Sequence, residues 1–227
     1  MPYYNFKMGD KMLLIAIISL NIFSACSRDS VQETPTIVDR ADTLPAQDTI
    51  MPPTSADTLH YLALGDSYTI GESVPYEARY PVQLVHQLRQ KNIIIAEPQI
   101  IARTGWTTQQ LKKALATNDL RKDYDLVSLL IGVNNQYQGM NIEIYQTEFR
   151  ELLQKALELA GGDRRRVFVL SIPDYAYTPF GRNSSSISKQ IDTYNAINLS
   201  ITASYGIQYF DITPISRKGL MQPDLVA

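Results

Sequence analysis

The stretch Tyr61-Leu-Ala-Leu-Gly-Asp-Ser-Tyr68 is an apolar run that ends at a glycine and continues into polar side chains. Such a run is typical of a buried strand that leads into a turn. Two further apolar runs along the chain end in the same way. The run that closes at Ala102 is followed by Arg-Thr-Gly-Trp, and the run that closes at Ile131 is followed by Gly-Val-Asn-Asn. The three junctions supply a hydroxyl, glycines that allow close approach of the backbone, and a side-chain amide, which are the groups that acyl transfer requires.

Around these junctions, strands and helices alternate. The pattern predicts strands over 61–64, 93–102 with a bend at Pro98, 126–131, 167–172 and 207–211. Helices are expected from Pro81, from Thr107 or Thr108, from Asn141 and over 187–201. Strands separated by helices need crossover connections, which produce an α/β fold with a parallel sheet covered on both faces. Ligands of open parallel sheets bind beyond the carboxyl ends of the strands, where the three junctions are expected to lie.

The blocks Gly65-Asp-Ser-Tyr68, Gly105 and Gly132-Val-Asn134 occur in the order in which the SGNH, or GDSL-type, hydrolases carry theirs. From about Tyr61 onward the chain resembles this family. The resemblance implies a flavodoxin-like three-layer α/β/α fold with a five-stranded parallel sheet, and hydrolysis of carboxylic esters without a cofactor or a metal. It makes Ser67 the nucleophile and assigns the oxyanion hole to the amides of Ser67 and Gly105 and to the Asn134 side chain. Asn135 stands where many members have Asp; since the donor role belongs to Asn134, we expect no effect on catalysis.

Each of these residues also has a plain structural interpretation. Ser67 can cap the following turn, Gly105 can be a helix-entry glycine and Asn134 can form an Asx turn. Asp66 fits a turn-forming residue better than an acid.

Three aromatic residues near the strand ends leave two alternatives open. Trp106 is expected to pack, or to line a substrate pocket. Tyr175 and Tyr177, which follow the fourth strand, either border that pocket or pack in the core.

A serine nucleophile needs a general base, which a carboxylate orients. In the family this pair arrives late, as Asp-x-x-His, and no such motif occurs in the 227 residues. Asp224 is followed three residues later by Ala227, so we interpret it as the approach to that motif and not as a triad member. His60 precedes the first strand and His86 lies inside the first helix. Neither is therefore expected at the carboxyl edge of the sheet, the edge at which the carboxyl ends of the parallel strands lie.

We therefore expect a form of the domain that is truncated before the Asp-x-x-His motif and lacks its terminal helix. This chain would then be inactive or nearly so. The alternatives are a non-catalytic binding module for acylated glycans or lipids, and a base supplied by a separate chain.

The first part of the chain has the pattern of an export signal. Basic residues precede an apolar stretch over 12–23, which is too short to span a membrane comfortably. Ser24-Ala-Cys26 resembles a bacterial lipobox, in which Cys26 is lipidated. Residues 1–26 are thus predicted to be a lipoprotein-type signal, 27–57 a flexible polar tether, and 58–227 the hydrolase domain. This organisation predicts an extracytoplasmic protein that a lipid anchor holds at a bacterial membrane.

The amino-acid composition of the chain limits the classes of partner and of site that it can have. The chain has 21 Lys and Arg against 23 Asp and Glu, a net charge of −2, one Cys and two His. This charge balance argues against a nucleic-acid partner, and the counts of Cys and His argue against a disulfide framework or a histidine-rich metal centre. The expected substrate is a small acyl ester, and the predicted location suggests an O-acetylated glycan or a lysolipid.

Overall fold

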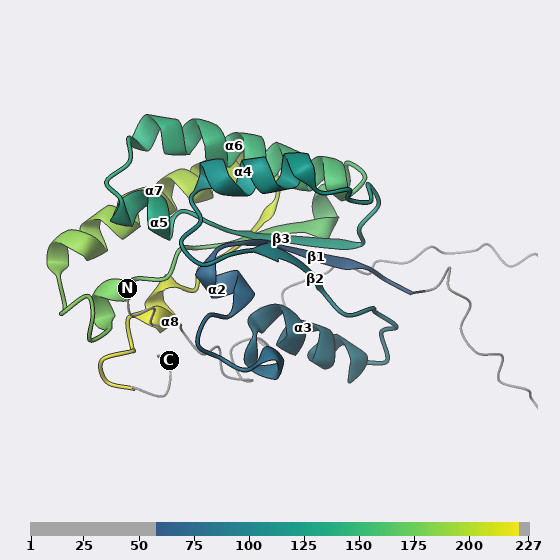
Figure 1. Cartoon of the computed structure of the whole chain (residues 1–227), viewed down its shortest axis with the longest axis horizontal. Helices are drawn as coiled ribbons and strands as arrows, with labels where there is room; N and C mark the ends of the chain where they lie inside the picture. Colours follow the sequence, from purple (N-terminus) through teal and green to yellow (C-terminus); the bar gives the residue numbers. More distant parts are fainter. Residues whose placement is uncertain (1–57, 223–227) are drawn as a thin grey trace, which may run out of the picture.

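The computed structural model describes residues 58–222 and contains a five-stranded parallel sheet (Figure 1). The predicted signal, lipidation site and tether (1–57) and the predicted role of Asp224 lie outside the described residues. The strand order is β2-β1-β3-β4-β5, with all four pairings parallel. The strands are β1 Tyr61–Gly65, β2 Gln99–Ala102, β3 Leu126–Leu130, β4 Val167–Leu170 and β5 Gln208–Phe210. The predicted α/β fold with a five-stranded parallel sheet is confirmed.

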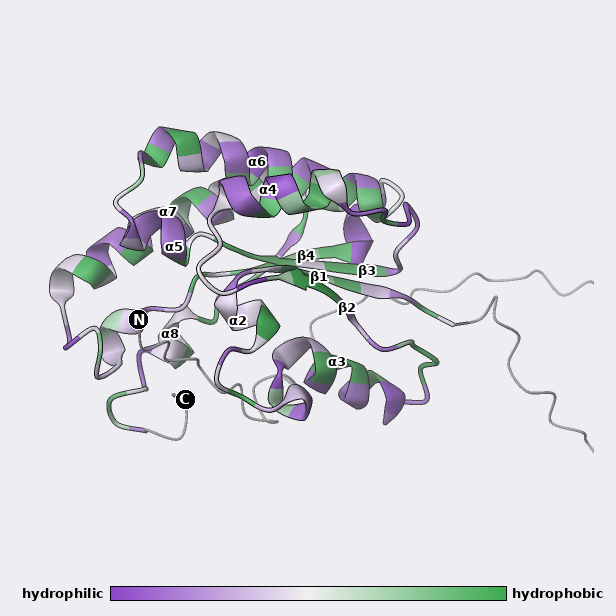
Figure 2. Ribbon diagram, in the orientation of Figure 1, coloured by the Kyte–Doolittle hydropathy of each residue, from purple (hydrophilic) through white to green (hydrophobic). Residues whose placement is uncertain are grey.

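One face of the sheet is covered by three amphipathic helices, α4 Thr108–Thr117, α6 Ile142–Leu159 and α7 Ser185–Ser204. Figure 2 shows hydrophobic segments of these helices alternating with hydrophilic ones. In α6, Tyr145, Phe149, Leu152 and Leu153 recur at helical spacing and are wholly buried, as the periodicity predicts. They pack on inward side chains of β1 and β3.

The other face is covered by α3 Tyr80–Arg89, which begins with Pro81 in its first turn. Leu84, Val85 and Leu88 of this helix are buried, as expected from the sequence, against Tyr61 and Ala63 of β1. With helices on both faces, the three-layer α/β/α arrangement is confirmed.

Helix starts follow the capping rules. Thr107, not Thr108, caps α4 in a reciprocal capping box with Gln110. The Asn141 side chain accepts a hydrogen bond from the Glu143 amide at the start of α6, over 2.7 Å.

The second strand is shorter than predicted. Of residues 93–98, Ile95 makes a single bridge to Leu59, and β2 begins only after Pro98. Proline has no amide hydrogen to donate to a ladder, so pairing resumes beyond it.

Several short elements were not predicted, because one turn of helix leaves no periodic pattern. They are α2 Ser67–Ile70, α5 Val133–Tyr137 and α8 Thr213–Ser216, together with the 3₁₀ turns η2 Tyr76–Ala78, η3 Arg164–Arg166 and η4 Tyr175–Tyr177. Two of them, α2 and α5, begin within the first and third junctions.

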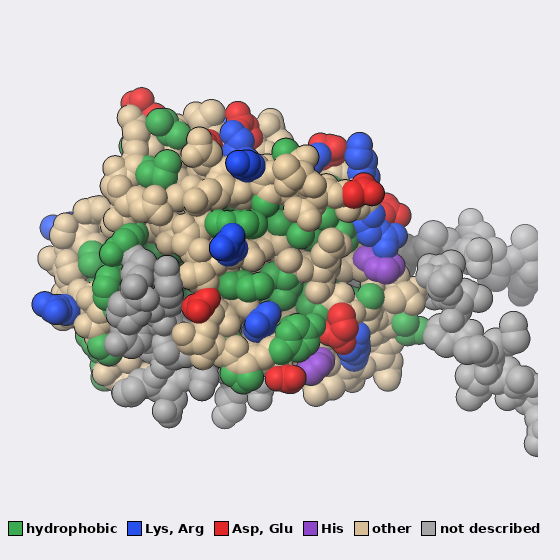
Figure 3. All heavy atoms as spheres, viewed as in Figure 1, with side chains coloured by type: hydrophobic (Ala, Val, Ile, Leu, Met, Phe, Trp, Pro, Cys, Tyr) green, Lys and Arg blue, Asp and Glu red, His purple; other side chains and the backbone are tan. Residues whose placement is uncertain are grey.

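None of the helices in residues 58–222 combines the length and the hydropathy that crossing a membrane requires. On the face drawn in Figure 3, Lys and Arg side chains lie interspersed with Asp and Glu.

Candidate active site

The three junctions start side by side at one edge of the sheet. Gly65, the last residue of β1, lies opposite Ala102 of β2 on one side and Leu130 of β3 on the other. Because these strands are parallel, the segments that follow them all leave the sheet at its carboxyl edge. Figure 1 shows α2 and α5 at this same end of the sheet.

Gly65 is required here by close packing. A Cβ at this position would collide with the Thr69 side chain and with the Leu130 carbonyl of the neighbouring strand. The glycine therefore lets the chain turn out of β1 tightly against β3.

Ser67 is the first residue of α2, and Asp66 rather than Ser67 caps this helix. The Asp66 carboxylate accepts a hydrogen bond from the Tyr68 amide, 3.1 Å away. The amide of Ser67 belongs to the first turn, where amides have no acceptor within the helix. Among the described residues the Ser67 hydroxyl has no hydrogen-bond partner, and its side chain is buried apart from a small exposed fraction. No hydrogen bond from the described residues therefore engages this hydroxyl at the carboxyl edge.

Gly105 occupies the third position of a turn that the Trp106 amide closes by donating to the Arg103 carbonyl, 3.2 Å away. Its φ of +82° is that of the third residue of a type II turn, which favours glycine. Gly105 is therefore a turn residue ahead of α4, and a side chain there would be strained.

Asn134 lies in the first turn of α5. Its Nδ2 donates to the Trp106 carbonyl over 2.9 Å, so the side chain bonds across to the second junction and makes no Asx turn. An amide nitrogen has two hydrogens, and this bond uses one of them. The bond fixes the orientation of the amide and leaves its second hydrogen available to a ligand.

Further hydrogen bonds link the three junctions. The Thr104 hydroxyl donates to the Glu72 carboxylate, which joins the second junction to the segment after α2. The Thr108 amide donates to Asn135 Oδ1 over 3.0 Å, which joins the start of α4 to α5. The pairing of Glu72 with Thr104 was not predicted, since no local pattern marks residues that pair over 32 positions. The structure brings Gly105 and Asn134 together through the Asn134–Trp106 bond. It links Ser67 to the second junction through Glu72, whose amide donates to the Ser67 carbonyl over 3.0 Å and whose carboxylate accepts from Thr104.

Asp66 is wholly buried below the Ser67 turn. The pKa of its carboxyl is raised from 3.8 to about 7 because burial disfavours the charged form. Backbone hydrogen bonds lower this pKa, but their effect is smaller. Its Oδ2 atom has no hydrogen-bond partner among the described residues. This carboxyl faces the protein interior and serves as a helix cap, as the turn-forming interpretation predicts.

Neither histidine lies at the carboxyl edge. His60 immediately precedes β1 at the opposite edge, where its amide donates to Asp125 over 2.9 Å. His86 is exposed within α3. In residues 58–222 no cluster of His, Cys, Asp and Glu has the arrangement of a metal site.

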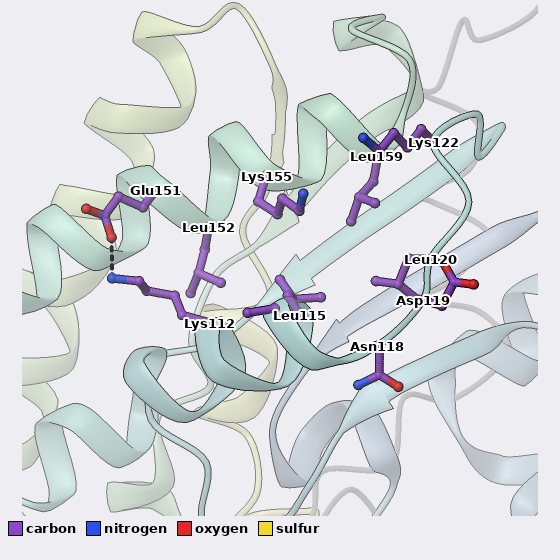
Figure 4. A pocket seen from close by; sticks show the side chains of 11 residues that line it. Lys112, Leu115, Asn118, Asp119, Leu120, Lys122, Glu151, Leu152, Lys155 and Leu159 are labelled. Carbon is purple, nitrogen blue, oxygen red and sulfur yellow. Dashed lines mark ion pairs between the residues drawn. The ribbon is translucent and has the colours of Figure 1, made fainter.

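A cavity of about 430 Å³ lies away from this edge, between α4 and α6 (Figure 4). Its floor is apolar, and its three lysines, Lys112, Lys122 and Lys155, each form an ion pair with a glutamate of α6. Residues of this cavity continue past the end of α4 toward the start of β3, so it opens toward the amino edge of the sheet. It is therefore separate from the candidate active site.

Comparisons with known proteins bear on the family and the fold of this chain. The sequence profile of the GDSL-like lipase/acylhydrolase family matches residues 63–226, well over half of the chain. A search of curated protein sequences found no significant match.

Several solved structures share the fold. An acetylxylan esterase from Geobacillus stearothermophilus superposes with a TM-score of 0.57 at 19% identity, covering 72% of this chain and 80% of that one. An SGNH-hydrolase family esterase gives 0.53 at 19% identity, covering 77% and 85%. A member of the lipolytic G-D-S-L family from Veillonella parvula gives 0.52 at 17% identity, covering 74% and 82%. The family profile and the shared fold together show that the chain belongs to the GDSL-like lipase/acylhydrolase family of carboxylic ester hydrolases.

Proposed function

We propose that this protein is a serine ester hydrolase that acts outside the cytoplasm, with Ser67 as the nucleophile. The oxyanion hole would consist of the amides of Ser67 and Gly105 and the second hydrogen of Asn134 Nδ2. The Asn134–Trp106 hydrogen bond is the observation that carries this proposal. It pre-orients the Asn134 donor beside the Gly105 turn, so no reorganisation is needed when charge develops on a substrate oxygen.

In the proposed reaction, Ser67 Oγ attacks the carbonyl carbon of an acyl ester while a base takes its proton. The negative charge that develops on the carbonyl oxygen is held by the three donors. Collapse of this intermediate breaks the bond to the alcohol, which leaves with the proton, and water then releases the acid from Ser67. No step requires a metal or a cofactor.

The general base is the missing component. Both histidines of the 227 residues lie away from the carboxyl edge, and the family's Asp-x-x-His motif does not occur in them. We infer that this chain on its own hydrolyses esters at a trace rate, through Ser67 and the oxyanion hole without a general base. A histidine carried on an Asp-x-x-His segment after Ala227 would complete the site.

The test compares p-nitrophenyl acetate hydrolysis by this chain and by a longer form carrying such a segment. The longer form should turn over, and Ser67→Ala should abolish that turnover. Asn134→Ala should lower kcat about 100- to 1,000-fold, as loss of one oxyanion donor does. A longer form that remains active after Ser67→Ala would overturn the assignment of the nucleophile.

The proposed substrates are small acyl esters, either O-acetylated glycans or lysolipids. The similarity to an acetylxylan esterase supports the glycan, and the proposed location at a membrane surface supports the lysolipid. The lipobox-like Ser24-Ala-Cys26 supports a lipid anchor on Cys26. Palmitate labelling in a bacterial host should mark the protein, and Cys26→Ser should remove the label and release the protein from the membrane fraction.

A non-catalytic binding module for acylated glycans or lipids is the second candidate. The position of both histidines away from the carboxyl edge favours it. If the longer form with Asp-x-x-His binds an acetylated sugar but never turns it over, this second function holds.

A further inference from the structure

Three aromatic rings from separate segments form a group at the carboxyl edge. Tyr137 ends α5, Tyr175 begins η4, and Phe180 lies in the segment between η4 and α7. The ring centroids are 6.2 Å apart for Tyr137 and Tyr175, and 6.0 Å apart for each pair that includes Phe180. These separations are those of interacting aromatic pairs. We call these three residues the aromatic cluster.

The aromatic cluster lies beside the proposed oxyanion hole. Tyr137 follows Asn134 by three positions on α5, and residues with this spacing are neighbours on a helix surface. On its other side the cluster approaches Ser67. Tyr68, the residue after Ser67, is partly buried and packs against the same core as Tyr175. The pKa of its phenol is raised first by burial, then by Asp66, and further by Tyr175 nearby. The cluster is therefore close to both the nucleophile segment and the Asn134 segment.

The cluster is partly open to solvent. Tyr137 is 43% exposed, while Tyr175 and Phe180 are half-buried. Exposed polar side chains of the same segments, Gln138 and Arg182, follow these rings closely in the chain. Tyrosine presents an apolar face and a polar tip, which suits a partner that has both kinds of surface.

The segment that carries two of the rings is firmly held. The buried Asp174 carboxylate accepts hydrogen bonds from the Ala176 amide at 3.0 Å and from Arg217 at 2.9 Å. The Asn183 amide donates to the Ala176 carbonyl over 2.8 Å, which closes the segment after Phe180. A fixed aromatic surface loses little conformational freedom when a ligand binds.

We propose that the aromatic cluster is a subsite for the alcohol half of the substrate, and that it stacks against a sugar ring. This proposal rests on the proposed function, because it places the sugar next to an acyl group held at Ser67 and Asn134. The C–H groups on one face of a pyranose are apolar and its hydroxyls are polar, which matches exposed tyrosine faces beside amide and guanidinium groups. The alcohol half of a lysolipid is a charged glycerophosphate headgroup, which has no apolar ring face to stack on the exposed ring of Tyr137. Of the two substrate classes, the cluster therefore selects the O-acetylated glycan over the lysolipid.

The test measures binding, so that its outcome does not depend on turnover. Acetylated xylo-oligosaccharide is titrated by calorimetry into this chain carrying Ser67→Ala, and into the same chain with one further substitution. Tyr137→Ala should raise the dissociation constant about tenfold, equivalent to 1.4 kcal/mol. Tyr137→Phe keeps the ring and should stay within about twofold of the parent, since stacking uses the ring face.

Tyr76→Ala is the matched control. Tyr76 is 42% exposed, and it lies in η2, outside the aromatic cluster. This variant should bind the oligosaccharide like the parent. Because both tyrosines are exposed, neither substitution is expected to disturb folding, which thermal unfolding verifies.

Two results would overturn the subsite. One is a Tyr137→Ala dissociation constant equal to that of the parent. The other is binding of lysophosphatidylcholine that Tyr137→Ala weakens while oligosaccharide binding is unaffected. The proposed function fails separately, if Ser67→Ala leaves the turnover of the longer form intact while the sugar still binds at the cluster.

Discussion

Asn135 and Thr108 exchange two hydrogen bonds across the second and third junctions. The Thr108 amide donates to Asn135 Oδ1 over 3.0 Å, and Asn135 Nδ2 donates to Thr108 Oγ1 over 2.6 Å. The Thr108 hydroxyl in turn donates its own proton to Glu148 over 2.5 Å. All three side chains are buried. The Asn135 amide thus donates to the Thr108 hydroxyl, and this hydroxyl donates to the Glu148 carboxylate. The need for a donor at position 135 gives a physical reason for Asn135 where many family members have Asp.

Asn135→Asp should therefore destabilise the protein. The substitution keeps the acceptor for the Thr108 amide but removes the donor to its hydroxyl, whose proton is committed to Glu148. A buried group without its partner costs about 1–3 kcal/mol. Urea unfolding at pH 7 should show a free energy of unfolding lower by this amount.

Glu148→Gln supplies the control. In the Asn135→Asp background, a glutamine amide at 148 can donate to Thr108, whose hydroxyl can then donate to the new carboxyl. The double variant should be more stable than the sum of the single effects predicts. Effects that add to within about 0.5 kcal/mol would show that the three groups are not coupled.

The hydrogen bonds among Asn135, Thr108 and Glu148 illustrate what the sequence could and could not predict. The apolar runs before Gly65, Gly105 and Gly132 predicted the strands and the edge at which the junctions meet, because a buried strand needs consecutive apolar residues. The partners Thr108 and Glu148 are 40 residues apart in the chain, and no local pattern links them. The sequence therefore revealed the departure at Asn135 but not its cause.

The aromatic cluster shows the same limit. Tyr175 was a candidate because it follows a strand, and the structure gives it contacts with the core as well as with the rings of Tyr137 and Phe180. Tyr137 and Phe180 were missed, since their approach depends on how α5 and the segment before α7 fold together. Likewise, residues 93–97 have the composition of a strand. Their pairing stops at the single bridge between Ile95 and Leu59, because Pro98 interrupts the ladder.

Asp66 should make stability depend on pH. Its folded pKa of about 7 lies above its ordinary value of 3.8, so between these values the folded state holds a proton that the unfolded state has released. The contribution of Asp66 to the free energy of unfolding is thus fully present below pH 4 and is lost as the pH rises toward 7. Asp66→Asn cannot titrate and keeps an oxygen for the Tyr68 amide. The variant should gain stability relative to the parent as the pH rises through this window, which denaturant unfolding at several pH values measures. Parallel curves for the two proteins would contradict the raised pKa.

The Arg217–Asp174 ion pair should be important for stability. Asp174 has no exposed side-chain surface, and its Oδ2 lies 2.9 Å from Arg217 Nε. Arg217→Met would leave a buried carboxylate without its cation, a change that typically costs about 3–5 kcal/mol. Arg217 also pairs with Asp192, whose side chain is 57% exposed, so Asp192→Asn should cost less than about 1 kcal/mol. Equal losses in thermal unfolding of the two variants would show that burial of Asp174 is not the decisive factor.

The two histidines should contribute nothing to the residual hydrolysis by the 227-residue chain. His60 lies at the amino edge and His86 is exposed on α3, while Ser67 and Asn134 lie at the carboxyl edge. A general base must reach the nucleophile within hydrogen-bond distance, and neither imidazole is placed to do so. A variant with His60→Gln and His86→Gln should therefore hydrolyse p-nitrophenyl acetate at the same trace rate as the parent, with the same dependence on pH between 5 and 8. A lower rate or a changed dependence on pH in the double variant would reveal a histidine that acts as the base. Ser67→Ala should lower the same trace rate, which separates hydrolysis at the site from background reaction with other surface groups.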